Sequence, residues 1–144
     1  MEQTVEAPNQ EDITQIAGQI LAGRELVERT YGSQESYGGL RDLDLIQGVL
    51  DLGAVGPEDA FDLRALGLMF GQVIVKQVDD MDWCMVEDDL GRTPALRYKE
   101  TSLIVFPMTM ISKRVEKAEE IDLHVFFETV REEIEKLKPE CVQH

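Results

Sequence analysis

The sequence predicts an α+β fold in a single domain, with three N-terminal helices, a three-stranded antiparallel meander and two C-terminal helices. Apolar residues recur at helical spacing on both sides of residues 81–110. Residues 81–110 themselves are rich in aromatic and β-branched side chains and are interrupted by turn residues, which is typical of short strands. A chain of 144 residues is long enough for one hydrophobic core without disulfides or metal.

The meander is expected to consist of strands at residues 83–87, 95–99 and 103–106. The first break contains Gly91, which can adopt a positive φ, and Pro94, which should stop the ladder; the second break is short and polar. A sheet of three strands cannot bury both faces by itself, so we expect the flanking helices to cover at least one of them.

The first two helices are predicted over residues 12–31 and 40–52, and the second has an acidic outer face. The residues expected to face the core from the first helix are Ile13, Ile16, Ile20, Leu21 and Val27. After the meander, two further helices are predicted, of which the last is capped by Asp122 and ended by Pro139.

The third helix, predicted over residues 57–77, is apolar on nearly every side from residue 61 to residue 75. A helix of this kind is buried on more than one side. Gly67 and Gly71 lie one turn apart. Because glycine destabilises a helix interior and usually has a packing reason there, we expect these two to admit another backbone, that of the sheet.

The composition is acidic, since 29 Asp and Glu residues against 14 Lys and Arg residues give a formal net charge of −15. This charge repels nucleic-acid phosphates and anionic membrane surfaces, so neither a nucleic acid nor a membrane is expected as a partner. The N-terminal helices carry most of the acidity, which would suit a basic partner.

The sequence indicates a cytoplasmic protein. Its polar N-terminus has no signal-peptide pattern, and its longest apolar run, residues 65–75, is shorter than a membrane-spanning helix requires. Two cysteines form no disulfide framework: Cys84 is expected to be buried, and Cys141 to be an exposed thiol.

Several motifs follow one another in the second half of the chain. They are Asp82-Trp83, Val86-Glu87-Asp88-Asp89-Leu90-Gly91-Arg92, Pro107, Ser112-Lys113-Arg114 and Phe126-Phe127. This pattern resembles a bacterial domain of unknown function, DUF3806, over roughly Phe61 to Leu137. Since no activity is attached to that family, the resemblance implies the fold and the extent of the domain and no reaction.

The resemblance divides the predicted domain, residues 11–138, into a variable helical part at 11–56 and a family-like part at 57–138. Residues 1–10 and 139–144 are expected to be flexible ends, because they offer little to bury.

No residue pattern indicates catalysis, a cofactor or a metal. Carboxylates bracket the first strand, at Asp79, Asp80, Asp82, Glu87, Asp88 and Asp89. They would suit Ca²⁺ or Mg²⁺, but they lack the ligand spacing of an EF-hand loop, and solvated turns explain them better. His124 and His144 have no partner at ligand spacing, and no serine or glycine-rich loop has the context of a nucleophile or a phosphate site.

Basic residues are concentrated around the meander, at Arg92, Arg97, Lys99, Lys113 and Arg114. In one interpretation they neutralise the hairpin carboxylates and tie the fourth helix to the sheet. In the other they form a recognition surface with Trp83 and Tyr98, because Trp, Tyr and Arg are frequent interface anchors; Trp83 suits the core equally well. The candidate binding residues are Trp83, Glu87, Asp88, Asp89, Arg92, Arg97, Tyr98, Lys113 and Arg114.

Two functions are compatible with these observations. The first is a non-enzymatic, cytosolic protein-binding or regulatory module of bacterial origin, which binds through the meander face or the acidic helices. The alternative is a small enzyme or ligand-binding domain with a charged cleft between the sheet and the helices. The sequence favours it less, because it offers no nucleophile or poised histidine. A homodimer is also compatible with the sequence, because the first or the third helix has more apolar residues than one core would need to bury.

Overall fold

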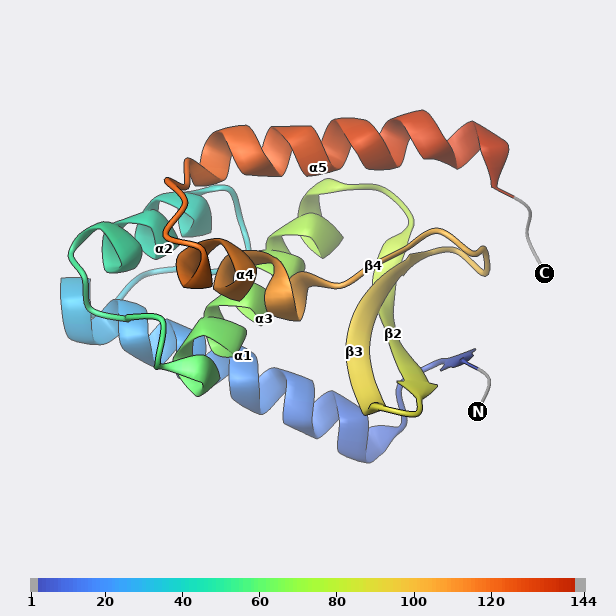
Figure 1. The fold of residues 1–144 in the computed structure, drawn as a ribbon, viewed down its shortest axis with the longest axis horizontal. Helices are drawn as coiled ribbons and strands as arrows, with labels where there is room; N and C mark the ends of the chain where they lie inside the picture. Colours follow the sequence, from blue (N-terminus) through green and yellow to red (C-terminus); the bar gives the residue numbers. More distant parts are fainter. Residues whose placement is uncertain (1–2, 142–144) are drawn as a thin grey trace.

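The computed structural model describes residues 3–141, which form five α-helices on one side of a four-stranded antiparallel sheet (Figure 1). The helices are α1 (Gln10–Tyr31), α2 (Arg41–Asp51), α3 (Ala60–Gln77), α4 (Met110–Glu116) and α5 (Leu123–Leu137). The strands are β1 (Thr4–Glu6), β2 (Met81–Asp88), β3 (Gly91–Tyr98) and β4 (Ile104–Val105), and the 3₁₀ turns are η1 (Pro107–Thr109) and η2 (Lys138–Glu140). The predicted α+β fold in a single domain is confirmed, with one additional strand. None of the described helices is long and apolar enough to cross a membrane.

The additional strand, β1, lies at one edge of the sheet, whose order is β1-β2-β3-β4. Thr4 pairs with Glu87 and Glu6 pairs with Met85 of β2, in a region that the sequence predicts to be flexible. Val5 is the one apolar residue of this short strand, so no alternation of apolar and polar residues marks it in the sequence. It forms because β2 offers a free edge with unpaired backbone groups.

The ends of the chain differ from prediction in a second way. Residues 138–140 form η2, and Cys141 is partly buried instead of exposed, with its Sγ donating to the carbonyl of Leu137 at 3.2 Å. Residues 1, 2 and 142–144, which include His144, lie outside the described residues.

Strands β2 and β3 form a hairpin closed by a two-residue turn. Pro94 lies inside β3 opposite Met85, whereas the sequence predicts that it ends the ladder. Because β4 pairs only with Leu96 and Arg97, β3 has a free edge beside Pro94 in the described chain. A residue without a backbone N–H is tolerated at such an edge.

Helix α3 lies at the centre of the core and contacts α1, α2, α4 and β2. Ten of its residues are buried, which confirms the predicted burial on more than one side. Phe70 stacks on Phe126 of α5 with ring centroids 5.5 Å apart and meets Phe127 edge-on at 6.3 Å. Phe61 is 58% exposed, because it belongs to the first turn of α3, beyond the packed part of the helix.

Helix α1 packs along α3 (Figure 1). Of the residues predicted to face the core from this helix, Ile16, Ile20 and Val27 are buried, whereas Ile13 and Leu21 are exposed. The apolar stripe that the sequence predicts is therefore wider than the side of α1 that α3 and the sheet cover.

Two glycines of α3 admit the chain that follows the sheet. A Cβ at Gly67 would lie 2.6 Å from the carbonyl oxygen of Pro107 and 2.8 Å from that of Met108. A Cβ at Gly71 would lie 2.7 Å from Cγ of Pro107 and 2.8 Å from Cη2 of Trp83. The predicted close approach is present, but the backbone that reaches Gly67 belongs to η1 and not to a strand.

Replacing Gly67 with alanine is expected to lower the free energy of unfolding by about 1–3 kcal/mol, because the added methyl group must displace the Pro107 carbonyl. Helix propensity by itself acts in the opposite direction by up to about 1 kcal/mol. Gly18→Ala, on the exposed side of α1 with no atom within 4 Å of the new methyl group, is the matched control and should be neutral or stabilising. Urea denaturation followed by circular dichroism measures both variants, and equal effects would contradict the packing role of Gly67.

Candidate functional site

The nine residues predicted as a binding site do not lie on one surface. Residues that pair across neighbouring strands point to the same face of a sheet, and successive residues alternate between faces. Arg92 pairs with Glu87, and Arg97 pairs with Asp82. Since the positions of Arg92 and Arg97 on β3 differ by an odd number, their side chains lie on opposite faces. Lys113 and Arg114 belong to α4.

Arg92 holds the N-terminal part of the chain against the sheet. Its Nε and Nη2 donate to the carboxylate of Asp12 at 3.0 and 2.5 Å, and its Nη1 donates to Glu6. Asp12 also accepts from the backbone N–H of Asn9 at 2.9 Å, within a capping box that begins α1. Arg92 lies across the hairpin from Glu87, as the predicted neutralisation of the hairpin carboxylates requires, but its hydrogen bonds go to residues of β1 and α1, which are far away in the sequence.

Two other predicted cations make local contacts. Nε of Arg97 donates to the carbonyl of Thr101 at 2.7 Å and holds the turn before β4. The guanidinium of Arg114 lies 4.0 Å from the ring centre of Phe126 and donates to the carbonyl of Met110 at 3.0 Å. Arg114 thus ties α4 to α5. Of the two residues predicted to tie this helix to the sheet, Lys113 or Arg114, Arg114 makes its contacts elsewhere, and the prediction stays open for Lys113.

The two predicted aromatic residues lie on the helix side of the sheet. Trp83 packs between the core clusters, and its Nε1 donates to Oε1 of Gln72 at 2.9 Å. The ring of Tyr98 is partly buried and lies beneath Lys138 of η2, whose Nζ is 5.2 Å from the ring centre. Both side chains are therefore placed by the fold itself.

The last three predicted residues lie in the hairpin turn and on α4. Oδ1 of Asp88 accepts from the backbone N–H of Leu90 at 2.9 Å, which shapes the turn. Asp89 and Lys113 are exposed.

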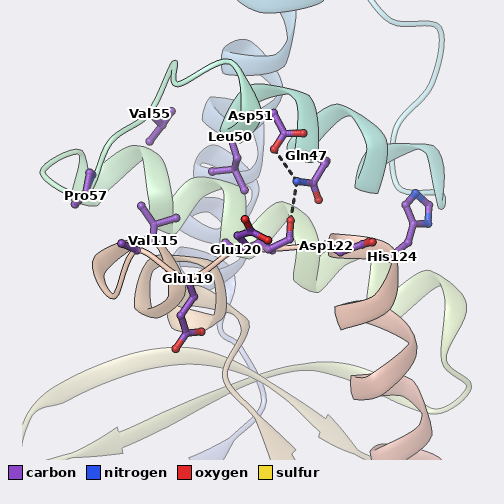
Figure 2. A pocket seen from close by; sticks show the side chains of 12 residues that line it. Gln47, Leu50, Asp51, Val55, Pro57, Val115, Glu119, Glu120, Asp122 and His124 are labelled. Atoms are coloured by element: carbon purple, nitrogen blue, oxygen red, sulfur yellow. Dashed lines mark hydrogen bonds between the residues drawn. The ribbon is translucent and has the colours of Figure 1, made fainter.

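A hollow of about 700 Å³ lies elsewhere, where the end of α2, the loop before α3 and the segment joining α4 to α5 meet (Figure 2). Its floor, by which we mean the buried and half-buried apolar residues of the lining, is formed by Leu50, Val55, Val115 and Ile121, and Pro57 is an exposed lining residue. Its rim is polar and mostly acidic, formed by Gln47, Asp51, Glu119, Glu120, Asp122 and His124, and Ala118 completes the lining. We call this feature the acid-rimmed hollow.

Gln47 holds the two sides of the acid-rimmed hollow together. Its Nε2 donates to the carbonyl of Ile121 at 2.8 Å and to Oδ1 of Asp51 at 2.9 Å (Figure 2). Its Oε1 accepts from the backbone N–H of Leu123 at 2.8 Å. This one side chain therefore joins α2 to the first residue of α5 and fixes the width of the hollow.

The start of α5 is held by two further bonds. Oδ1 of Asp122 accepts from the backbone N–H of Val125 at 3.2 Å, as the predicted helix cap requires. Nε2 of His124 lies 2.7 Å from Oδ1 of Asp44 on α2. The sequence identifies Asp122 as a cap and His124 as a surface residue, but nothing in it shows that they border a hollow with α2.

The charge of the residues that line the acid-rimmed hollow is predominantly negative. Four carboxylates line it, and no described lining residue is Lys or Arg. Negative potential over an apolar floor favours a ligand that combines positive charge with apolar groups. The described lining also contains no Ser, Thr or Cys that could act as a nucleophile. In residues 3–141, no group of three or more His, Cys, Asp or Glu side chains could hold a metal ion.

Comparison with known proteins identifies a family for most of the chain. The family described as "Domain of unknown function (DUF3806)" matches residues 42–127. The match includes α2, which the sequence pattern places outside the family-like part, and ends at Phe127 within α5. Every residue that lines the acid-rimmed hollow lies inside the match, whereas Glu6 and Asp12, the partners of Arg92, lie outside it.

A crystal structure from Bacteroides thetaiotaomicron VPI-5482 has a similar fold, with a TM-score of 0.80 and 19% sequence identity. The similarity covers 90% of this chain and 47% of that one, so the present chain spans about half the length of the solved protein. At this identity the likeness concerns the fold alone. No curated protein matches the chain.

The stability of the protein should depend on pH through Asp12. Its hydrogen bonds with Arg92, and then with the Asn9 backbone, lower its pKa below the ordinary value. The stabilisation from this carboxylate is therefore complete above the pKa of the unfolded chain, about 3.9, and is lost as the pH falls toward the lower folded value. Wild type should exceed Asp12→Asn in free energy of unfolding at neutral pH, and the difference should shrink near pH 3. Urea denaturation at both pH values measures it, and a difference independent of pH would argue against the ion pair.

Gln47→Ala is expected to lower the free energy of unfolding by about 1–3 kcal/mol, because the partly buried N–H of Leu123 and carbonyl of Ile121 lose their partner. Gln15→Ala, on the exposed side of α1, is the matched control and should change the free energy of unfolding by less than about 0.5 kcal/mol. Thermal and urea denaturation compare the two variants. Similar small effects would show that Gln47 does not hold the hollow together.

Proposed function

The chain belongs to the DUF3806 family of domains of unknown function, and we propose that it is a non-enzymatic module that binds another protein through the acid-rimmed hollow. The observation that carries this proposal is the combination of an apolar floor with four rim carboxylates and no described Lys or Arg in the lining. Burying an apolar surface of this kind against a partner is energetically favourable, and the surrounding carboxylates select a partner of complementary charge.

The surroundings of the hollow support a partner larger than a metabolite. Leu52 directly follows the lining residue Asp51 in the chain and is 68% exposed. Large apolar side chains that remain exposed next to a hollow extend the surface that a protein partner can cover. Glu119 and Glu120 are also exposed, so they can reach groups that lie outside the hollow.

The alternative, an enzyme or ligand-binding domain with a charged cleft between sheet and helices, has weaker support. A hollow of about 500 Å³ is lined by Trp83 and Cys84 of β2 and by Arg97 of β3. The hollow between α1 and the sheet measures about 140 Å³, and its Arg92 is already bonded to Asp12. Burial raises the pKa of the Cys84 thiol to about 11, which keeps it protonated and unreactive at neutral pH.

Both cysteines carry free thiols, which suits the reducing cytoplasm that we propose as the compartment.

The proposal is tested by affinity capture from a lysate of the source organism. The baits are wild type, the rim variant Glu119→Lys/Glu120→Lys, and the control Glu132→Lys/Glu133→Lys, which reverses the same number of charges on the exposed side of α5. We expect wild type and control to retain the same protein and the rim variant to lose it, because reversed charges repel a partner that complements the rim.

The captured protein is then purified, and its affinity for the three baits is measured by calorimetry. Circular dichroism first shows that all three baits are folded. Retention of one protein by all three baits equally, or by none of them, would contradict a binding function for the hollow.

A further inference from the structure

We infer that the occupant of the acid-rimmed hollow is an amphipathic basic segment of the partner, with apolar side chains seated on the floor and Lys or Arg side chains reaching the rim. This inference rests on the proposed function and specifies the partner's chemistry. Its basis is the placement of the carboxylates around an apolar centre.

The carboxylates come from two segments of the chain, the end of α2 and residues 119–122. Asp51 ends α2, Glu119 and Glu120 lie between α4 and α5, and Asp122 precedes α5. In the view of Figure 2, Asp51 and Glu119 lie on opposite sides of Leu50 and Val115. A complementary segment therefore needs positive charge on both sides of an apolar group, and a single cation would satisfy one side only.

The bonds inside the rim leave most of this negative charge uncompensated by cations. Asp51 accepts from the neutral amide of Gln47, and Asp122 accepts from a backbone N–H. His124 is the one described lining residue that can carry positive charge, and its contact is with Asp44. Like charges around one hollow repel each other, and a bound cationic segment would relieve that repulsion.

Charge also argues against a second copy of this chain as the occupant. The formal net charge is −15, so two copies repel each other, and the repulsion is greatest where acidic rims would meet. Phosphate-rich partners are disfavoured for the same reason. A basic segment is the partner chemistry that both the floor and the rim favour.

The test uses three fluorescein-labelled peptides and fluorescence anisotropy. The first peptide combines Lys and Leu at amphipathic helical spacing, the second has Glu in place of Lys, and the third has Ser in place of Leu. We expect the Lys/Leu peptide to bind wild type, with an affinity that falls as salt is raised. The Glu peptide should not bind, and the Ser peptide should bind about tenfold more weakly, because it covers no apolar floor.

Matched variants separate the hollow from the general acidity of the chain. Glu119→Gln/Glu120→Gln should weaken binding of the Lys/Leu peptide about threefold or more, whereas Glu132→Gln/Glu133→Gln on α5 should leave it nearly unchanged. Equal weakening by both variants would show non-specific attraction to an acidic protein and would overturn the inference. Equal binding of the Ser peptide, which acts as a plain polycation, would also overturn it.

Two outcomes separate this inference from the function on which it rests. A captured protein that is lost by the rim variant, but whose binding is insensitive to salt and maps to a segment without Lys or Arg, overturns the inference and leaves the binding function standing. Sedimentation that shows self-association of wild type and its loss in Glu119→Lys/Glu120→Lys would identify a second copy as the occupant and would likewise overturn the inference. Absence of any captured protein contradicts the proposed function itself.

Discussion

The structure depends on the close crossing of α3 by the chain segment that follows the sheet. At Gly67 no side chain separates the helix from the carbonyls of Pro107 and Met108, and at Gly71 the ring of Pro107 and the indole of Trp83 occupy the space that a Cβ would need. Because α4 begins directly after η1, this crossing sets the position of α4. It also attaches β2 to the central helix through Trp83, so sheet and C-terminal helices are both anchored on the same side of α3.

The acid-rimmed hollow is a consequence of that placement. With α4 fixed against α3, the segment leading to α5 passes beside the end of α2, and Gln47 joins the two by two hydrogen bonds. Phe126 and Phe127 then hold α5 on Phe70. The hollow is thus framed by side chains that also stabilise the fold, and a site held in this way would lose little conformational entropy on binding the proposed partner.

The basic residues of the chain mainly make contacts within the fold, whereas the rim of the hollow is acidic. With 14 basic against 29 acidic residues, cations are scarce, and several of them make structural contacts. Arg92 bonds Asp12 and Glu6, Arg114 lies on Phe126, and Lys138 bonds Glu135. The rim of the hollow receives none of them among the described residues. The four carboxylates of the rim are therefore left without a Lys or Arg neighbour in the described lining.

The sequence by itself determined the parts of this protein that local physics controls. The periodicity of apolar residues defines the helices, the all-round apolar character of α3 places it in the core, Gly67 and Gly71 mark a close approach, and Asp122 caps α5. These features depend on residues a few positions apart, whose spacing is visible in the chain.

Only the tertiary structure decided that β1 pairs with β2, that Arg92 bonds Asp12, and that an acid-rimmed hollow forms between α2 and α5. Each of these contacts joins residues some eighty positions apart. Such residues meet because the core packs in one way, and no local pattern records which of many carboxylates or strand edges will be the partner.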